Sequence, residues 1–164
     1  MDFSDYRPHF LLRSGNANTI FSDLKRKRQQ EFPYKRKRLN TPDGDFIDVD
    51  YYRGGNPRIA YILHGLESSS HGSYVLGMAQ VLKEQGWDIA AINYRSCSGE
   101  INRTRRIYYA GATDDVDFVL RDFVEDYEEV AMVGFSFGGS LTMRYGGEQK
   151  VALHPHIKAL VAIS

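Results

Sequence analysis

Hydrophobic positions in this chain fall into short apolar runs separated by segments of helical period. Residues 36–39 and 46–52 are predicted to be strands, and the Thr-Pro-Asp-Gly turn at 41–44 joins them into a hairpin. In such a turn Pro presets one backbone angle and Gly supplies the left-handed one. Near-continuous apolar runs, typical of strands covered on both faces, occur at 59–63, 89–92, 130–133 and 157–163.

Helices are predicted between the apolar runs. Their apolar positions recur at helical spacing at Val75, Met78, Ala79 and Leu82, and again at Val116, Val119, Leu120 and Phe123. Gly86 is placed to close the first helix, and Thr113 to cap the second, whose first turn is acidic. A third helix is predicted to follow Ser136 and to end at Gly146-Gly147. Because strands and helices alternate, the chain is predicted to be an α/β protein, with a mostly parallel sheet, helices on both faces and an N-terminal β-hairpin.

The composition fits one domain with a sizeable core, since 42% of the 164 residues are hydrophobic. No apolar run approaches the ~20 residues of a membrane span, and the N-terminus lacks the basic-then-apolar order of a signal peptide. We therefore expect a cytoplasmic protein without a transmembrane segment. The single cysteine, Cys97, excludes an internal disulfide. No spacing of His or Cys indicates a metal site, and no cofactor is expected.

Charge is balanced over the whole chain but uneven along it. The 21 basic and 21 acidic residues cancel, yet residues 1–40 carry ten Lys and Arg against four Asp and Glu. Most of this excess lies in the Lys-Arg-Lys-Arg runs at 25–28 and 35–38. The residues after 40 carry eleven Lys and Arg against seventeen Asp and Glu. We interpret residues 1–34 as a solvated basic arm and residues 35–164 as the core, with the basic N-terminal part packing against the acidic remainder. The alternative is a basic patch that binds nucleic acid, anionic lipid or a targeting receptor.

The apolar run at 130–133 leads into Gly134-Phe135-Ser136-Phe137-Gly138, a Gly-x-Ser-x-Gly pattern followed by a helix. The pattern is typical of a sharp strand-to-helix turn that holds the serine in a strained conformation with its hydroxyl exposed. Side chains two residues before or after the serine would collide with the turned backbone or the neighbouring strand, so glycine is expected at both places. Ser136 is therefore a candidate nucleophile for attack on a carbonyl carbon. The alternative is a glycine-rich loop that carries an inert serine.

Three loops are predicted to meet at the carboxyl edge of the parallel sheet, where α/β proteins of this kind carry their sites. They contain Ser136, residues 64–67 and residues 95–100. The backbone N–H groups of Leu66 and Phe137 are the predicted pair that stabilises the oxyanion formed during acyl transfer. His64 is expected to orient its loop by a hydrogen bond rather than to act as a base.

The remaining candidate side chains are assigned structural roles. His154 and His156 precede the last strand and are expected at the opposite edge of the sheet, about 15–20 Å from Ser136. Cys97 is expected to be a packed loop thiol. A serine nucleophile needs a positioned base, itself held by an acid, and the residues after Ser136 offer neither at the required edge.

Six blocks of sequence, in order along nearly the whole chain, carry a resemblance to a known family. They are Asn-Thr-Ile-Phe at 18–21, Thr-Pro-Asp-Gly-Asp-Phe at 41–46, His-Gly-Leu-Glu-Ser-Ser-Ser at 64–70, Asn-Tyr-Arg-Ser-Cys-Ser-Gly-Glu-Ile-Asn at 93–102, Gly-Ala-Thr-Asp-Asp at 111–115 and Gly-Phe-Ser-Phe-Gly-Gly at 134–139. With these blocks the chain resembles the N-terminal part of an α/β-hydrolase of the YheT-like branch, which includes bacterial hydrolases and eukaryotic lipid-active relatives.

The resemblance implies a serine hydrolase of carboxylic esters, from short-chain esters to acylglycerols, with Ser136 as nucleophile and the Leu66 and Phe137 amides as oxyanion hole. It implies a small-molecule ester substrate and a role in lipid metabolism, with no nucleic-acid partner. In this superfamily the acid and base follow the serine as Asp or Glu and then His. They are therefore expected to be missing from this chain, together with the last strands and the lid, which leaves a fragment nearly inactive by itself. The alternative is a non-catalytic α/β scaffold or binding module that uses the basic arm.

Overall fold

A computed structural model of the protein describes residues 31–149 and 153–164. The expected basic arm, residues 1–34, therefore lies almost entirely outside the described residues. Within the described ranges, no helix combines the length and the apolar character that crossing a membrane would require.

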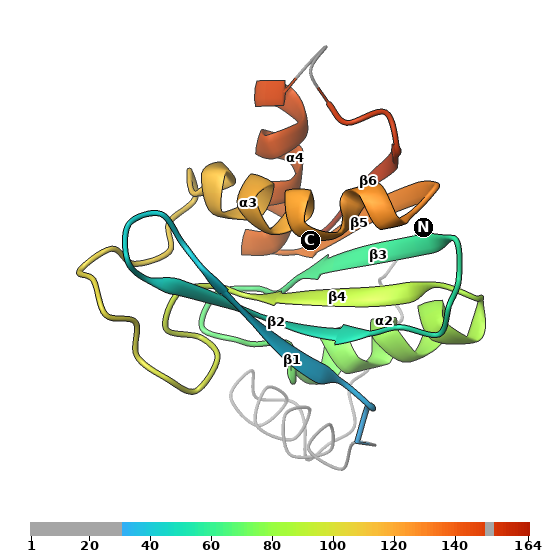
Figure 1. The fold of residues 1–164 in the computed structure, drawn as a ribbon, viewed down its shortest axis with the longest axis horizontal. Coiled ribbons are helices and arrows are strands. Elements are labelled where there is room, and N and C mark those ends of the chain that lie inside the picture. The colour runs from blue at the N-terminus through green and yellow to red at the C-terminus, as the bar shows by residue number, and fades with distance from the viewer. Residues whose placement is uncertain (1–30, 150–152) are drawn as a thin grey trace, which may run out of the picture. The chain divides into compact units, whose positions relative to one another are not determined.

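Among the residues that the structure describes, six strands form a single sheet in the order β1-β2-β4-β3-β5-β6 (Figure 1). Their bounds are Lys35–Asn40 (β1), Phe46–Tyr52 (β2), Arg58–Leu63 (β3), Asp88–Asn93 (β4), Glu129–Phe135 (β5) and Ile157–Ile163 (β6). Strands β3 to β6 pair in parallel, whereas β1 and β2 form an antiparallel hairpin whose second strand pairs with β4. In the hairpin turn Gly44 has a φ of +80° and donates its N–H to the Thr41 carbonyl. The predicted hairpin and mostly parallel sheet are confirmed.

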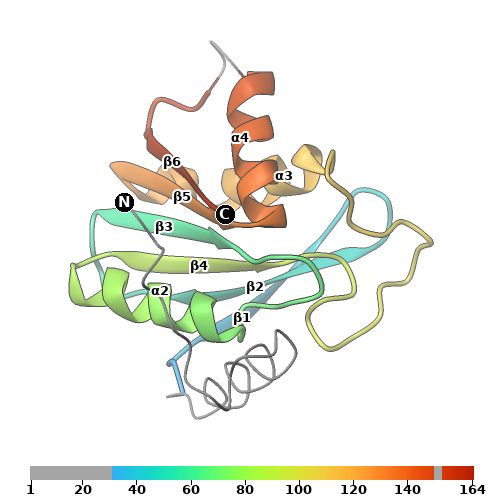
Figure 2. The same cartoon turned by 180° about the vertical axis from the view of Figure 1, so that it is seen from behind.

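Helices cover both faces of the sheet, as predicted (Figures 1 and 2). Helix α2 (Ser73–Glu84) lies on one face, and α3 (Thr113–Phe123) and α4 (Phe137–Gln149) lie on the other. The chain leaves β3 through α2 to reach β4 on one side, and then crosses through α3 to β5 on the other side. Right-handed crossovers in opposite directions place their helices on opposite faces.

The core divides accordingly into two clusters, because successive side chains of a strand point to opposite faces. Ala60 and Ile62 of β3 pack with the α2 side chains Val75 and Ala79. The alternate β3 residues belong to the larger cluster under α3 and α4, with Ile59, Tyr61, Leu63, Val116, Leu120 and Leu141 among its members. Strand β3 is thus buried on both faces, which explains why its residues after Arg58 are all apolar.

Two predicted helix boundaries are wrong. Thr113 does not cap α3 but is its first residue, and its hydroxyl donates to the Glu148 carboxylate of α4 at 2.5 Å. Helix α4 does not end at Gly146-Gly147 but continues to Gln149. Gly146 permits close packing, since a Cβ there would lie 2.3 Å from the Leu160 side chain of β6. In both places a tertiary contact outweighs the local signal.

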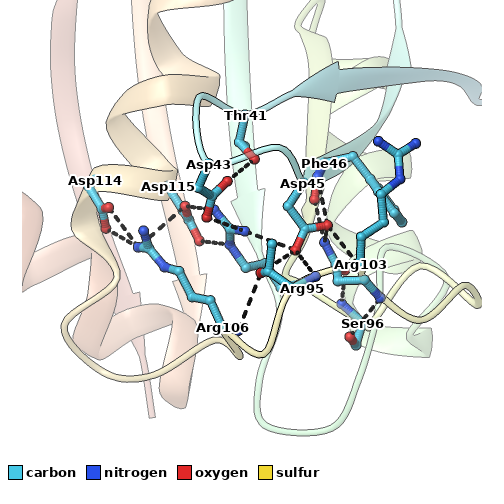
Figure 3. Close-up of polar contacts among 12 residues, drawn as sticks. Thr41, Asp43, Asp45, Phe46, Arg95, Ser96, Arg103, Arg106, Asp114 and Asp115 are labelled. Carbon is cyan, nitrogen blue, oxygen red and sulfur yellow. Dashed lines mark hydrogen bonds and ion pairs between the residues drawn. The ribbon is translucent and has the colours of Figure 1, made fainter.

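A buried polar network joins the hairpin turn to the loop between β4 and α3 (Figure 3). The fully buried Asp45 carboxylate accepts hydrogen bonds from the Asn102 side chain at 2.6 Å, and from the hydroxyl and amide of Thr104 at 2.7 and 3.1 Å. The Phe46 and Arg103 amides donate to the same carboxylate at 2.9 and 3.0 Å. Four donors of the loop, from Asn102, Arg103 and Thr104, therefore fix it to one carboxylate.

Arg95 extends the network to α3. Its side chain is 1% exposed, and its Nε and Nη2 donate to both carboxylate oxygens of Asp115 at 2.8 and 2.9 Å. Its Nη1 lies 3.0 Å from an Asp43 oxygen and 3.3 Å from an Asp45 oxygen. A buried guanidinium needs such partners, because an unpaired buried charge carries a large desolvation penalty.

Burial by itself would raise the pKa of Asp45. The hydrogen bonds from Thr104, Arg103 and Asn102 outweigh that effect and hold its pKa well below the usual range. Asp45 thus stays charged in the folded protein, because the surrounding hydrogen-bond donors stabilise its carboxylate.

We expect Asp45→Asn to lower the free energy of unfolding by about 3 kcal/mol, because the amide removes a counter-charge of Arg95 and leaves buried donors unsatisfied. Urea denaturation measures this change. The matched control is Asp126→Asn, which breaks an exposed ion pair with Arg53 and should cost less than about 1 kcal/mol. Equal losses in the two variants would contradict the role given to Asp45.

The same carboxylate predicts sensitivity to acid. Because its pKa is lower in the folded than in the unfolded chain, its stabilisation is complete above the unfolded value of about 3.9 and is lost as the pH falls through the folded value. The free energy of unfolding should therefore decrease on acidification below about pH 4. In Asp45→Asn this decrease should be less steep.

Candidate active site

Ser136 occupies a single-residue turn between the end of β5 and the start of α4. Its φ is +48°, in the left-handed region, and its N–H donates to the Ile163 carbonyl of β6 at 2.7 Å. A non-glycine residue in this region costs about 1–3 kcal/mol and persists only where the surroundings enforce it. Ser136 is nevertheless exposed. The structure thus has the strained, solvent-facing serine that the sequence predicts.

The surrounding glycines enforce this turn. A Cβ at Gly134 would lie 2.2 Å from the Gly138 carbonyl oxygen, and a Cβ at Gly138 would lie 2.3 Å from the Leu63 carbonyl oxygen. At Gly139 a Cβ would meet the Ala162 side chain of β6 at 3.2 Å. The predicted collisions with the turned backbone and the neighbouring strand are confirmed.

A cleft of about 610 Å³ opens beside Ser136. Leu66, Phe137, Met143 and Ile163 contribute apolar side chains to its walls, beside Ser140 and Ser164. A second cavity of about 380 Å³ lies among the ion pairs of Arg95 and Arg106 and shares no lining residue with the first. Because its charges are already paired and it contains no nucleophile, we place the candidate site at the first cleft.

The loop of residues 64–67 lies against the serine turn. A Cβ built on Gly65 would lie 3.7 Å from the Ser136 Cβ. The Gly65 amide donates to the Tyr74 hydroxyl at 2.9 Å, and the Glu67 amide donates to the Tyr108 hydroxyl at 3.2 Å. Glu67 itself has a φ of +51°. Two tyrosine hydroxyls thus fix the loop on both sides of Leu66.

The Leu66 amide lies between the Gly65 and Glu67 amides, which are both hydrogen-bonded. Within residues 31–149 and 153–164 it donates to no protein acceptor, and the Leu66 side chain is 64% exposed. Phe137 is the first residue of α4, where helix geometry provides no intrahelical acceptor for its N–H. Both residues line the cleft beside Ser136.

His64 is buried and holds the loop from below. Its Nδ1 lies 2.7 Å from the Gly65 carbonyl oxygen and donates to it, while its Nε2 accepts the Tyr94 amide at 3.4 Å. Burial lowers the pKa of His64 to about 4, so the ring is neutral at physiological pH. Since both ring nitrogens are engaged, His64 positions the loop, in agreement with the sequence.

An aromatic cluster connects the 64–67 loop with the serine turn. Tyr94 stacks on Tyr108 at 5.4 Å between ring centroids, and Phe137 packs edge-on against both at 5.4–5.5 Å. The Tyr94 hydroxyl donates to the His64 carbonyl at 2.8 Å. Nearby, burial raises the pKa of the half-buried Cys97, as expected of a packed thiol. The loop anchored by Asp45 therefore packs, through Tyr94 and Tyr108, against Phe137 beside the cleft.

The fold and this geometry agree with what comparisons with known proteins find. The family model described as alpha/beta hydrolase fold matches residues 61–164. The chain belongs to the α/β-hydrolase family. Over 122 residues it is 35% identical to YheT of Escherichia coli, an esterase by name, covering 70% of this chain and 36% of YheT. Over 142 residues it is 28% identical to the phospholipase ABHD3 of Bos taurus, covering 80% of this chain and 34% of ABHD3.

Solved structures lead to the same fold. The mouse alpha/beta hydrolase domain-containing protein 10 aligns with a TM-score of 0.64 at 18% identity, covering 78% of this chain and 48% of that one. The resemblance to the N-terminal part of a YheT-like α/β-hydrolase is confirmed, and the chain spans about a third of the length of the curated relatives named above.

The late histidines of this α/β-hydrolase chain lie away from Ser136, as predicted. His156 precedes β6, and its carbonyl accepts the amide of Val130 at the start of β5, whereas Ser136 follows the end of β5. Among the described residues, no histidine hydrogen-bonds to the Ser136 hydroxyl.

The structure brings together one cluster of groups that could hold a metal ion and that the sequence did not predict. Glu125, His154 and His156 lie together at the amino edge of the parallel strands. Spacing gave no sign of it, because Glu125 and His154 are 29 residues apart in sequence. The short His-x-His pattern at 154–156 was the available signal.

We expect Gly138→Ala to lower the free energy of unfolding by about 3 kcal/mol or more, because the new methyl group cannot coexist with the Leu63 carbonyl. Thermal or urea denaturation measures the loss. The matched control is Gly147→Ala in the same helix, where a Cβ meets nothing within 4 Å. That change should raise stability by about 0.5–1 kcal/mol. A well-tolerated Gly138→Ala would contradict the tight backbone contact.

Proposed function

We propose that the whole protein is a serine hydrolase of carboxylic esters and that Ser136 is its nucleophile. The observation that carries the proposal is the enforced left-handed conformation of an exposed serine beside an unengaged loop amide. Strain at a residue that contributes little to packing is typical of functional positions. The names of the relatives, an esterase and a phospholipase, support an ester as substrate.

In the proposed reaction the Ser136 oxygen forms a bond with the acyl carbon, and the carbonyl π electrons move onto its oxygen. The Leu66 and Phe137 amides donate hydrogen bonds to this oxyanion, which exists only in the tetrahedral intermediate and the flanking transition states. When the carbonyl re-forms, the C–O bond to the alcohol breaks and the alcohol leaves with a proton. Water then attacks the acyl-enzyme and releases the acid.

The proton of Ser136 needs a base, which we place outside this chain. His64 is neutral with both ring nitrogens engaged, and His154 and His156 precede β6 at the other edge. The chain spans about a third of its relatives, so there is room for a base and its acid in the remainder of the whole protein. The order serine, acid, histidine in this superfamily supports that assignment.

The apolar side chains of Leu66, Phe137, Met143 and Ile163 in the cleft support an acyl group as the part of the substrate bound next to Ser136. A small-molecule ester with an apolar acyl chain satisfies both this surface and the proposed chemistry. The alternative of a non-catalytic scaffold with a basic arm has no support among the described residues and is an outcome of the following test.

We expect the full-length protein to react with a fluorophosphonate probe in a one-to-one ratio, because the activated serine attacks the phosphorus and displaces fluoride while the phosphoryl oxygen occupies the oxyanion position. Ser136→Ala should abolish labelling, measured by intact-protein mass spectrometry. The matched control is Ser140→Ala, one turn along α4 and in the same cleft, which should label like the wild type.

A folded full-length protein that does not label would remove the hydrolase and favour the non-catalytic scaffold. Labelling that survives Ser136→Ala would place the nucleophile elsewhere.

Tyr108→Phe tests the support of the Leu66 amide. The change removes the hydroxyl that accepts the Glu67 N–H and leaves the ring stacking in place. Losing an oxyanion donor outright costs about 10²–10³ in kcat, so a displaced donor should cost about tenfold. The loss should appear in kcat with KM nearly unchanged, because the oxyanion forms after substrate binding.

The measurement is ester hydrolysis by the full-length protein, with Tyr109→Phe as control because the Tyr109 side chain is exposed. An unchanged kcat in Tyr108→Phe would show that the Glu67 contact does not position the loop.

A further inference from the structure

Two histidines and a glutamate converge at the edge of the sheet opposite Ser136. One ring nitrogen each of His154 and His156 and one carboxylate oxygen of Glu125 all lie within 4.8 Å of one another. They come from the short helix η2 (Val124–Asp126) and from the turn before β6. We propose that these three side chains bind a zinc ion, and that the ion ties η2 to the start of β6.

The backbone holds the two histidines in place. The Ile157 amide donates to the His154 carbonyl at 2.9 Å, which closes a β-turn with Pro155 at its second position. The His156 carbonyl accepts the Val130 amide of β5 at 2.8 Å. A ligand pair fixed by a proline turn and by sheet pairing loses little conformational freedom when it binds an ion.

His156 is oriented as a neutral ligand. Its Nδ1 lies 3.3 Å from the Val124 carbonyl oxygen, which can only accept a hydrogen bond. The ring proton is therefore on Nδ1, and the lone pair of Nε2 is left for an ion. A backbone carbonyl that holds the second ring nitrogen is the usual outer partner of a histidine ligand.

His154 and Glu125 are spaced for a shared ion. Nε2 of His154 lies 3.0 Å from Oε1 of Glu125, and two ligand atoms at about 2.0 Å on tetrahedral zinc are about 3.3 Å apart. An ion between them replaces the Nε2 proton, and the ring proton then resides on Nδ1. Binding of the ion therefore breaks the 3.3 Å hydrogen bond that the His154 Nδ1 accepts from the His156 amide. The Glu125 carboxylate is 75% exposed and free to rotate toward the ion.

The donor set selects the class of ion. Two imidazoles and one carboxylate suit zinc and its transition-metal neighbours, whereas magnesium prefers oxygen ligands alone. The cluster lies at the start of β6, and Ser136 follows the far end of β5. The ion would therefore lie away from Ser136, and the proposal stands apart from ester hydrolysis.

The test is a titration of the 164-residue chain with Co²⁺, which reports four- or five-coordinate geometry through its visible absorption. We expect saturation at one Co²⁺ per chain, displacement by Zn²⁺ and no displacement by Mg²⁺. His154→Ala, His156→Ala and Glu125→Gln should each weaken binding at least about tenfold. The matched control is His71→Ala, which removes an exposed histidine elsewhere and should leave binding unchanged.

Thermal unfolding provides a second measurement. Zn²⁺ should raise the Tm of the wild type and of His71→Ala, and leave the Tm of His156→Ala unchanged, because an ion that binds only the folded state stabilises it. Circular dichroism establishes that each variant is folded. The absence of binding, or binding that survives in His154→Ala and His156→Ala alike, would overturn the proposal.

Discussion

The first turn of α4 lies in backbone contact with the ends of β3 and β5, and the rest of the site depends on this approach. Gly138 has no room for a methyl group beside the Leu63 carbonyl, and Gly134 has none beside Gly138. Between them Ser136 is forced to a φ of +48° and remains exposed. The same turn starts α4 at Phe137, so the positions of the proposed nucleophile and of one proposed oxyanion donor follow from one backbone constraint.

The second proposed oxyanion donor, the Leu66 amide, depends on a different kind of support. The loop of residues 64–67 is held by hydroxyls of Tyr74 and Tyr108 and by a buried His64, none of which belongs to the serine turn. Tyr108 in turn lies on a long loop without helix or strand, between β4 and α3. Such a loop keeps one conformation only if its polar groups are satisfied. The charged Asp45 does this, and so a carboxylate in the hairpin turn contributes to the geometry around Ser136.

Local signals in the sequence predicted most of the fold and the serine turn, because both are short-range. Apolar runs mark buried strands, and the glycines around Ser136 are demanded by contacts within a few residues or with an adjacent strand. The errors arose where a distant residue decides. Thr113 has the residue type of a helix cap, but its hydroxyl donates to Glu148 instead. Gly146 has the residue type of a helix end, but in the structure it allows Leu160 to pack closely against α4. The contact of Asp45 with Asn102 spans 57 residues, and no local pattern encodes it.

In the proposed chemistry, the nucleophile and the oxyanion donors belong to this chain and the base does not, and this difference has a structural reason. The nucleophile and the oxyanion donors are properties of the backbone, which β3, β5 and α4 determine together, and all three belong to this chain. A general base is a property of a side chain, and any loop that reaches the carboxyl edge can deliver it. Removing or replacing that loop would leave the strained serine unchanged, because no base takes part in the contacts that strain it. The geometry of the serine turn is therefore independent of where the base of the proposed reaction comes from.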